Sequence, residues 1–203
     1  MTARIEKVVT SGTFSLDGQD FAVDNNVWLV GDDDEVVVID AAHDAGAILA
    51  AVGDRRLAAV IATHGHNDHV SAAPEVGARG GAKVLLHPAD QVLWQLAHPD
   101  QRPDGVLAGG QLIDIAATTL RVLHTPGHSP GSVSVYAPDL GVVFSGDTLF
   151  HGGPGATGRS YSDRPTILAS IRGTLLRLPP ETVVHTGHGE DTTIGAEAEA
   201  LTE

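Results

Sequence analysis

The sequence predicts an α/β fold in which an antiparallel meander leads into alternating strands and helices. Three short segments rich in Val and Ile, at residues 4–14, 26–30 and 35–40, are separated by Asp-Gly and Gly-Asp-Asp-Asp turn signals, which predicts the meander. From residue 45 onward, helical and extended hydrophobic patterns alternate along the chain. Such alternation is typical of strands that are joined through helices.

The elements after the meander follow in a regular order. We expect a helix at residues 45–52, a buried strand at 57–62, a polar loop, a helix at 70–78 and a strand at 83–86. Pro88 suits the first turn of a further helix. Residues 95–110 contain two prolines and three glycines and are expected to form a surface loop.

The last part of the chain is expected to add further strands and one long helix. Strands are predicted at residues 119–123, 132–137, 142–145 and 182–186. Pro165 begins the helix, on which four apolar residues recur at helical spacing: Leu168, Ile171, Leu175 and Leu178. Pro179 and Pro180 end it.

Length and composition indicate one globular domain spanning residues 1–203. The 42% hydrophobic and 19% charged content are those of a folded protein with a substantial interior. The net charge is −14 and the 12 basic residues are scattered, so no nucleic-acid partner is expected, because phosphate backbones would be repelled. The expected partner is a small-molecule substrate, and nothing in the pattern specifies an oligomeric state.

The chain has no cysteine, so a bound metal would be held by nitrogen and oxygen atoms. The first ten residues lack the apolar stretch of a secretion signal. No later run approaches the ~18 apolar residues of a membrane span. These observations predict a cytoplasmic protein without a membrane partner.

A histidine-rich segment, THGHNDH at residues 63–69, follows the apolar run 57–62 directly. It holds four groups able to bind a metal: His64, His66, Asp68 and His69. Residues two apart on a helix do not face one another, so we expect His64, His66 and Asp68 to converge from extended or looped backbone. The alternative is a histidine-rich surface loop without a metal.

Three further motifs follow predicted strands, where open α/β sheets usually place their ligands. They are TPGHSPG at 125–131, SGDTLF at 145–150 and TGHG at 186–189, and they contribute His128, Asp147 and His188. A single histidine after a strand is more often a hydrogen-bonded structural residue than a ligand. Together with the first motif, however, the three indicate a metal site.

With these motifs, the chain resembles the metallo-β-lactamase superfamily, and within it the glyoxalase II-like (hydroxyacylglutathione hydrolase-like) hydrolases, over residues 26–197. The resemblance implies an αβ/βα four-layer sandwich of two mixed β-sheets with helices outside. It implies one metal at His64, His66 and His128, a second at Asp68, His69 and His188, and a bridge at Asp147. Asp40 matches a position that supports the ligands from behind.

The resemblance also implies the activity. It predicts an enzyme that uses two divalent ions, zinc first, with iron or manganese as alternatives, to cleave a small thioester or ester by metal-bound hydroxide. Asp68 and Asp147 are the implied catalytic residues. β-Lactamases of the superfamily lack the bridging carboxylate, so Asp147 disfavours antibiotic hydrolysis.

Other functions stay open at this point. They are a lactonase with the same ligands, a noncatalytic metal-dependent binding module, and a persulfide dioxygenase whose single iron would be held by His64, His128 and Asp147. GHSPG at 127–131 also matches the G-x-S-x-G motif of serine hydrolases, in which a strand leads into a helix. Ser129 is instead followed by Pro-Gly and a strand pattern, so we expect no serine nucleophile.

The remaining histidines have less specific patterns. His43 and His151 lie close in sequence to motif residues and could reach the pocket, whereas four others are expected to be structural or surface residues: His87, His98, His124 and His185. The glycine-rich segment 152–163 is expected to form one wall of the pocket. Its Arg159 aligns with an arginine that supports the site in glyoxalase II-like sequences.

Overall fold

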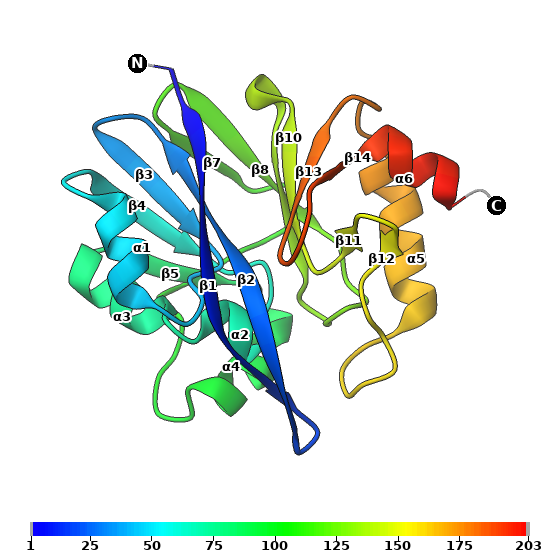
Figure 1. The fold of residues 1–203 in the computed structure, drawn as a ribbon, viewed down its shortest axis with the longest axis horizontal. Coiled ribbons are helices and arrows are strands. Elements are labelled where there is room, and N and C mark those ends of the chain that lie inside the picture. The colour runs from blue at the N-terminus through cyan, green and yellow to red at the C-terminus, as the bar shows by residue number, and fades with distance from the viewer. Residues whose placement is uncertain (1, 202–203) are drawn as a thin grey trace.

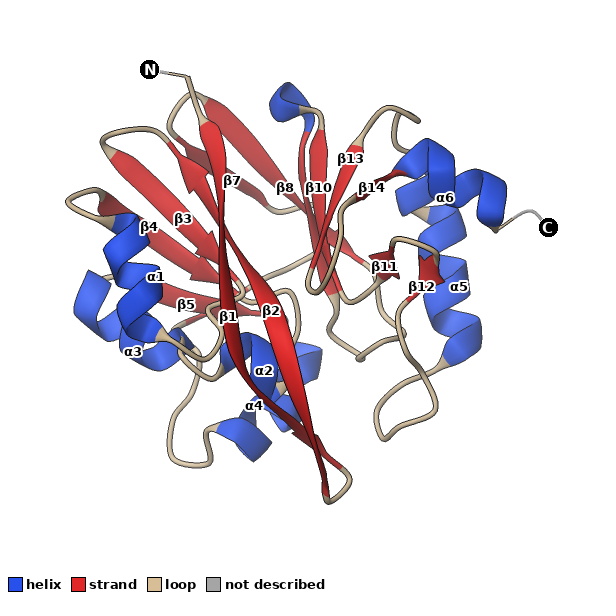
Figure 2. Cartoon of the chain, in the orientation of Figure 1, coloured by secondary structure: helices blue, strands red, loops and turns tan. Residues whose placement is uncertain are grey.

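Two six-stranded sheets pack face to face, and helices cover their outer faces (Figures 1 and 2). The computed structural model describes residues 2–201. The strand order is β1-β2-β3-β4-β5-β6 in the first sheet and β14-β13-β10-β9-β8-β7 in the second. This is the αβ/βα four-layer arrangement that the resemblance implies.

The first half of the chain forms the first sheet and its helices. The strands are β1 (Arg4–Leu16), β2 (Gln19–Gly31), β3 (Glu35–Ile39), β4 (Arg56–Ile61), β5 (Lys83–Leu86) and β6 (Gly105–Val106). The helices are α1 (Ala45–Val52), α2 (Asn67–Val70), α3 (Ala73–Gly80) and α4 (Gln91–Ala97), the last preceded by a 3-10 turn, η1 (Pro88–Asp90). β1 to β3 pair antiparallel and β3 to β6 pair parallel, so both predicted parts of this half are confirmed.

The second half forms the second sheet. Its strands are β7 (Leu112–Ile115), β8 (Thr118–His124), β9 (Val133–Ala137), β10 (Val142–Gly146), β13 (Val183–Thr186) and β14 (Thr192–Thr193). A small separate ribbon comprises β11 (Leu149–Phe150) and β12 (Gly153–Pro154). The helices are α5 (Arg164–Gly173) and α6 (Ile194–Ala200), and 3-10 turns occur at η2 (Pro138–Leu140) and η3 (Leu175–Arg177).

The apolar run at residues 36–39 shows why the sheets lie in the middle of the molecule. Val36 and Val38 pack into the cluster beneath the helices of the first half. Val37 and Ile39, which point the other way, pack into the cluster between the two sheets. Because strand side chains alternate in direction, a continuous apolar run is what a strand buried on both faces requires.

The β1–β2 hairpin forms an arm that extends beyond the rest of the first sheet (Figure 1). The strands pair from Arg4 opposite Gly31 to Leu16 opposite Gln19, and both turn residues, Asp17 and Gly18, have positive φ angles. The sequence analysis predicted only 4–14 and 26–30 as strand. Most side chains at residues 19–24 are exposed, so no burial pattern marked them.

Two predicted helices and one predicted loop need correction. The helix expected at 70–78 is two helices, α2 and α3, and α2 already begins at Asn67. The long helix from Pro165 ends at Gly173; Leu175 lies in η3, and Leu178 only packs against the same buried cluster. The expected loop 95–110 carries the end of α4 and the short strand β6. Bonds to distant segments set two of these boundaries, because Ala72 N donates to Ala41 O between α2 and α3, and β6 pairs with β5.

Among residues 2–201, none of the helices is both long enough and apolar enough to span a membrane.

Candidate metal centre

Seven side chains from five segments meet where strands of the two sheets end. The loop after β4 supplies His64 and His66, and α2 supplies Asp68 and His69. The loops after β8, β10 and β13 supply His128, Asp147 and His188, respectively. All seven belong to groups whose donor atoms lie within 4.8 Å of one another. The sequence motifs therefore converge in space.

The backbone that brings the first motif together differs in part from expectation. His66 has extended backbone, with φ −65° and ψ 144°, and precedes the first residue of α2. Asp68 lies inside that helix, so the period-two argument was wrong for this residue. Asp68 and His69 form one group with His188, and His69 also forms a group with His64 and Asp147, so His69 lies between the two ends of the site.

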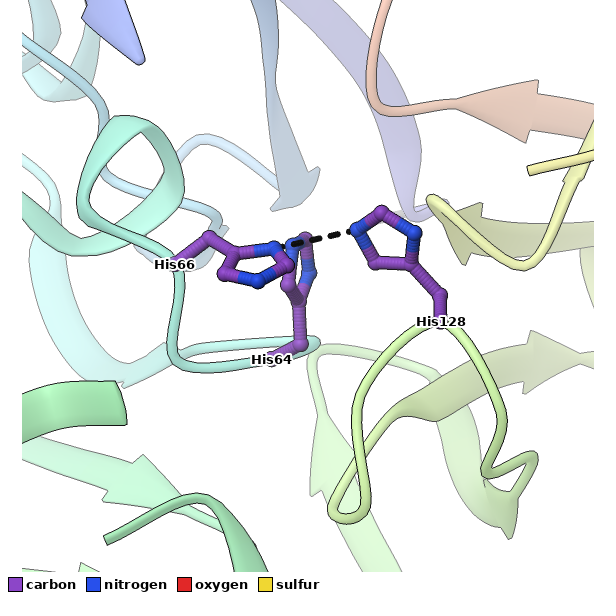
Figure 3. Close-up of side chains that lie close together, drawn as sticks. All are labelled: His64, His66 and His128. Atoms are coloured by element: carbon purple, nitrogen blue, oxygen red, sulfur yellow. Dashed lines mark hydrogen bonds between the residues drawn. The ribbon is translucent and has the colours of Figure 1, made fainter. Parts of the chain in front are cut away.

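The first trio consists of His64, His66 and His128 (Figure 3). Their ring centroids are 4.8 to 4.9 Å apart and the rings are nearly perpendicular. The Nδ1 atom of His66 lies 3.0 Å from the Nε2 atom of His128. Two imidazole nitrogens this close need a proton or a cation between them.

The second trio consists of Asp68, His69 and His188. The Nε2 atoms of His69 and His188 are 3.2 Å apart, and Asp68 Oδ2 lies 3.5 Å and 3.3 Å from them, respectively. Donor atoms of a tetrahedral zinc site, about 2.0–2.1 Å from the ion, lie roughly 3.3 Å from one another. The second trio therefore has the spacing that such a site needs.

Asp147 contacts both trios. Its Oδ1 atom lies 3.3 Å from His69 Nε2, and its Oδ2 atom lies 3.5 Å from both His188 Nε2 and His128 Nε2. One carboxylate thus faces nitrogen donors of each group. In addition, His64 Nε2 and Asp68 Oδ1 are buried without a hydrogen-bond partner among residues 2–201. Such atoms are costly unless a cation takes their lone pairs, so the donor set fits a two-metal centre.

Hydrogen bonds to the outer ring nitrogens fix the tautomers of four histidines. Their Nδ1–H groups have acceptors at Thr63 Oγ1 for His64, Asp40 Oδ2 for His69, Ala156 O for His128 and Asp24 O for His188. In each of these four histidines, Nε2 is therefore the nitrogen that faces the site and would bind a metal. Asp40 also accepts from both Thr63 N and Thr63 Oγ1, so it supports the ligand loop from behind, as expected.

The two trios differ in charge. Burial lowers the pKa of His64 well below its usual value, and burial with the neighbouring His128 lowers the pKa of His66 to about 3. Both imidazoles are therefore neutral at pH 7. Burial would raise the pKa of Asp147, but His69 and His188 hold it well below its usual range. In the second trio, burial lowers the pKa of His69 and of His188, but the Asp147 carboxylate outweighs burial and raises the pKa of His69 well above its usual value and that of His188 to about 10. The first trio is therefore neutral, whereas the second trio without a metal pairs two charged imidazoles with ionised Asp147, and a bound cation would take the place of that positive charge.

Comparison with known proteins decides the family. Residues 21–188 match the metallo-beta-lactamase superfamily. The chain belongs to this superfamily of metallo-hydrolases.

The chain is 31% identical over 193 residues to the hydroxyacylglutathione hydrolase GloC of Haemophilus influenzae. The alignment covers 87% of this chain and 91% of GloC. The fold also matches the crystal structure of TTHA1623 in a di-iron-bound form, with a TM-score of 0.79 and 33% sequence identity. The match covers 94% of this chain and 98% of the TTHA1623 chain. The crystal structure of the B3 metallo-β-lactamase BLEG-1 matches with a TM-score of 0.77 and 33% sequence identity. This match covers 94% of this chain and 97% of the BLEG-1 chain.

A cavity of about 260 Å³ is lined in part by five of the seven candidate metal ligands: His66, Asp68, His128, Asp147 and His188. Its apolar wall comes from the β1–β2 arm, through Phe14, Leu16, Phe21 and Val23. Segment 152–163 also lines this cavity, as expected, and packs on the arm: the Arg159 guanidinium lies 4.5 Å from the centre of the Phe21 ring and donates to Gln19 Oε1. The arm and the segment therefore enclose a small apolar pocket.

The histidines outside the motifs separate into two groups. His43 reaches the site through one intervening residue, since its Nε2 atom lies 2.9 Å from Asn25 Oδ1. His151 is exposed in the turn between β11 and β12 and does not line the pocket. His87 stacks on His124, and His98 and His185 bond to Val70 O and Asp191, so these four are structural or surface residues, as expected.

Sequence reasoning missed two polar residues at this centre, Asn25 and Asp90. Both are 0% exposed. Asn25 Nδ2 donates to Asp68 Oδ2 at 3.2 Å. Asp90 accepts from the backbone N–H groups of Gly65 and Gly131, one in each ligand loop of the first trio. Asn25 and Asp90 are single polar residues at the edge of apolar segments, and neither belongs to a motif with a recognisable spacing, so the sequence alone did not identify them.

Asp90→Ala is expected to lower the free energy of unfolding by about 3 kcal/mol, because the buried N–H groups of Gly65 and Gly131 lose the acceptor that they have among residues 2–201. Denaturant unfolding of the metal-free protein measures this, with the exposed Asp100→Ala as the matched control. If Asp90→Ala stayed within about 1 kcal/mol of the wild type, like an ordinary surface substitution, its proposed role in joining the loops would be excluded.

Ser129 is held in a way that does not suit a nucleophile. It is 0% exposed, its Oγ atom donates to Asp90 Oδ2 at 2.6 Å, and it lies 2.7 Å from Ser132 Oγ. We therefore expect Ser129→Ala to retain hydrolysis within about threefold of the wild-type rate, because metal-assisted hydrolysis needs no serine. Steady-state rates with equal metal content check this. A loss on the order of a thousandfold would revive the serine-hydrolase interpretation.

Proposed function

We propose that the protein is a dinuclear metal-dependent hydrolase that cleaves a small thioester or ester, in the manner of glyoxalase II-like enzymes. The observation that carries the proposal is the position of Asp147, whose carboxylate faces nitrogen donors of both trios at 3.3 to 3.5 Å. A single-metal site would not need one carboxylate to face two complete sets of ligands. The relative named hydroxyacylglutathione hydrolase supports the same reaction class.

The residues of the chain have distinct roles in this proposal. Two divalent ions would lower the pKa of a shared water to about 7 and polarise the carbonyl group that it attacks. Asp147 holds the two half-sites together. Asp68 Oδ2 lies 3.3 Å from His188 Nε2, and Oδ1 is buried without a hydrogen-bond partner among residues 2–201. The carboxylate of Asp68 would therefore hold the second ion with one oxygen and orient the attacking water with the other. Asp40 keeps His69 in the tautomer that binds through Nε2.

We propose zinc as the native metal. The donors are imidazole nitrogens and carboxylate oxygens, and the second trio has tetrahedral spacing, which zinc accepts readily. Iron is the main alternative because TTHA1623 has been crystallised in a di-iron-bound form. Manganese also binds such donors.

The pocket supports a small substrate with an apolar acyl group. Its volume is about 260 Å³, and Phe14, Leu16 and Phe21 line one side. Arg159 is the cationic side chain among the residues that line this cavity. We therefore expect a compact, apolar acyl donor to bind better than a highly charged one.

A substrate panel tests the proposal. Metal-loaded protein would be assayed with thioesters, including a hydroxyacylglutathione, and with simple esters, lactones, a persulfide and a chromogenic β-lactam, since BLEG-1 is a β-lactamase. We expect thioesters or esters to be turned over fastest and the activity to disappear on metal removal. Oxygen consumption with the persulfide, without thioester or ester hydrolysis, would overturn the proposal in favour of a dioxygenase.

A further inference from the structure

Asn25 and His43 form a polar pair behind the second trio. Asn25 lies in β2 and is 0% exposed, and its Nδ2 atom is 3.2 Å from Asp68 Oδ2. Its Oδ1 atom lies 2.9 Å from His43 Nε2. The pair thus extends the network of Asp68 through the interior to the segment between β3 and α1.

The chemistry of the partners fixes the direction of each hydrogen bond. An ionised carboxylate only accepts, so Asn25 must turn its amino group toward Asp68. The amide oxygen then faces His43, which must carry its proton on Nε2 in order to donate. With His43 in this role, the amide of Asn25 cannot rotate without losing both bonds.

The backbone around His43 is shaped to hold the ring there. His43 has a φ of +57°, a conformation that residues other than glycine adopt only when the surroundings impose it. Its N–H donates to Ser71 Oγ at 2.8 Å. On the facing strand β1, a Cβ atom at Gly12 would overlap the imidazole of His43, so glycine is needed at this position. Three separate features therefore place His43 against Asn25.

We propose that His43 and Asn25 are a positioning pair that orients Asp68 and thereby sets the affinity of the second trio for its metal ion. This inference rests on the two-metal centre proposed above. Neither residue lines the substrate pocket. Asn25 Nδ2 donates to Asp68 Oδ2 and also lies 3.2 Å from His69 Nε2 and 3.4 Å from His188 Nε2, so the pair acts through the second trio, with Asp68 as its acceptor. Residues of this outer kind typically change metal affinity about 10- to 100-fold when they are replaced.

The test is zinc binding, measured by competition with a chromophoric chelator on protein that has first been stripped of metal. We compare the wild type with His43→Ala, Asn25→Ala, the double variant and Gly12→Ala, and use the exposed His151→Ala as the matched control. We expect the first ion to bind as in the wild type and the second to bind at least about tenfold more weakly. The double variant should bind no more weakly than Asn25→Ala, because His43 acts only through Asn25.

Gly12→Ala removes neither member of the pair and should reproduce the effect of His43→Ala by displacing its ring. It keeps the test valid if Asn25→Ala fails to fold. Second-ion affinities within twofold of the wild type, or additive losses in the double variant, would overturn the pairing. If the wild type bound one ion only, the two-metal proposal itself would fail, whereas a second ion bound with wild-type affinity in every variant would refute this inference alone.

Discussion

His188→Ala is expected to lower thioester or ester hydrolysis at least about a hundredfold, in line with the damage that altered metal shells cause. The imidazole of His188 lies 3.2 Å from His69 Nε2 and 3.3 Å from Asp68 Oδ2, and its Nδ1 atom is anchored by Asp24 O. Removing it leaves the second trio one donor short. The measurement is kcat/KM with saturating metal, together with the metal content of each protein.

His185→Ala is the matched control, because His185 lies three residues earlier and its Nδ1 atom pairs with Asp191 outside the centre. It should retain activity near the wild-type value. A fully active His188→Ala variant, in a protein that consumes oxygen with a persulfide, would show that one iron site is sufficient and that the hydrolase assignment is wrong.

Asp147→Ala is expected to reduce hydrolysis to the background rate. Two divalent cations about 3.5–4 Å apart repel each other strongly unless an anion lies between them. Asp147 faces both trios, and the neighbouring His69 and His188 hold its pKa well below its usual range despite burial, so it is ionised at pH 7. Rates and bound metal are measured on the same samples.

Asp147→Asn separates charge from shape, because it keeps one oxygen donor and loses the negative charge. We expect this variant to bind less metal than the wild type and to lose most of its activity. Retention of two ions and of wild-type activity in Asp147→Ala would contradict the bridging role.

The elements that could be predicted from the sequence are those whose side chains are buried. Strands buried on both faces, such as β3 with its run Val36 to Ile39, carry a signal in the sequence itself. The outer part of the β1–β2 arm has mostly exposed side chains, so only the Asp17-Gly18 turn marked it. The separation of α2 from α3 was not predictable from local pattern, because Ala72 N bonds to Ala41 O in a distant segment.

The residues of the candidate site likewise fall into those that the sequence predicted and those that only the fold revealed. Candidate metal ligands occur in motifs with fixed spacing, so the convergence of His64, His66 and their partners could be predicted from the sequence, although Asp68 proved to be helical. Asn25 and Asp90 act through contacts with residues 25 to 43 positions away. Such contacts exist only in the folded chain. For the same reason His43 and His151 were indistinguishable in sequence, and only the fold separates them.

The number of metal ions per active chain tests the central claim most directly. Protein purified and reloaded with zinc, then freed of excess ions, would be analysed for metal and protein content and assayed for hydrolysis in the same preparation. Our account predicts close to two ions per chain, with activity that depends on the second. One ion per chain under metal-replete conditions, with hydrolysis intact, would contradict it.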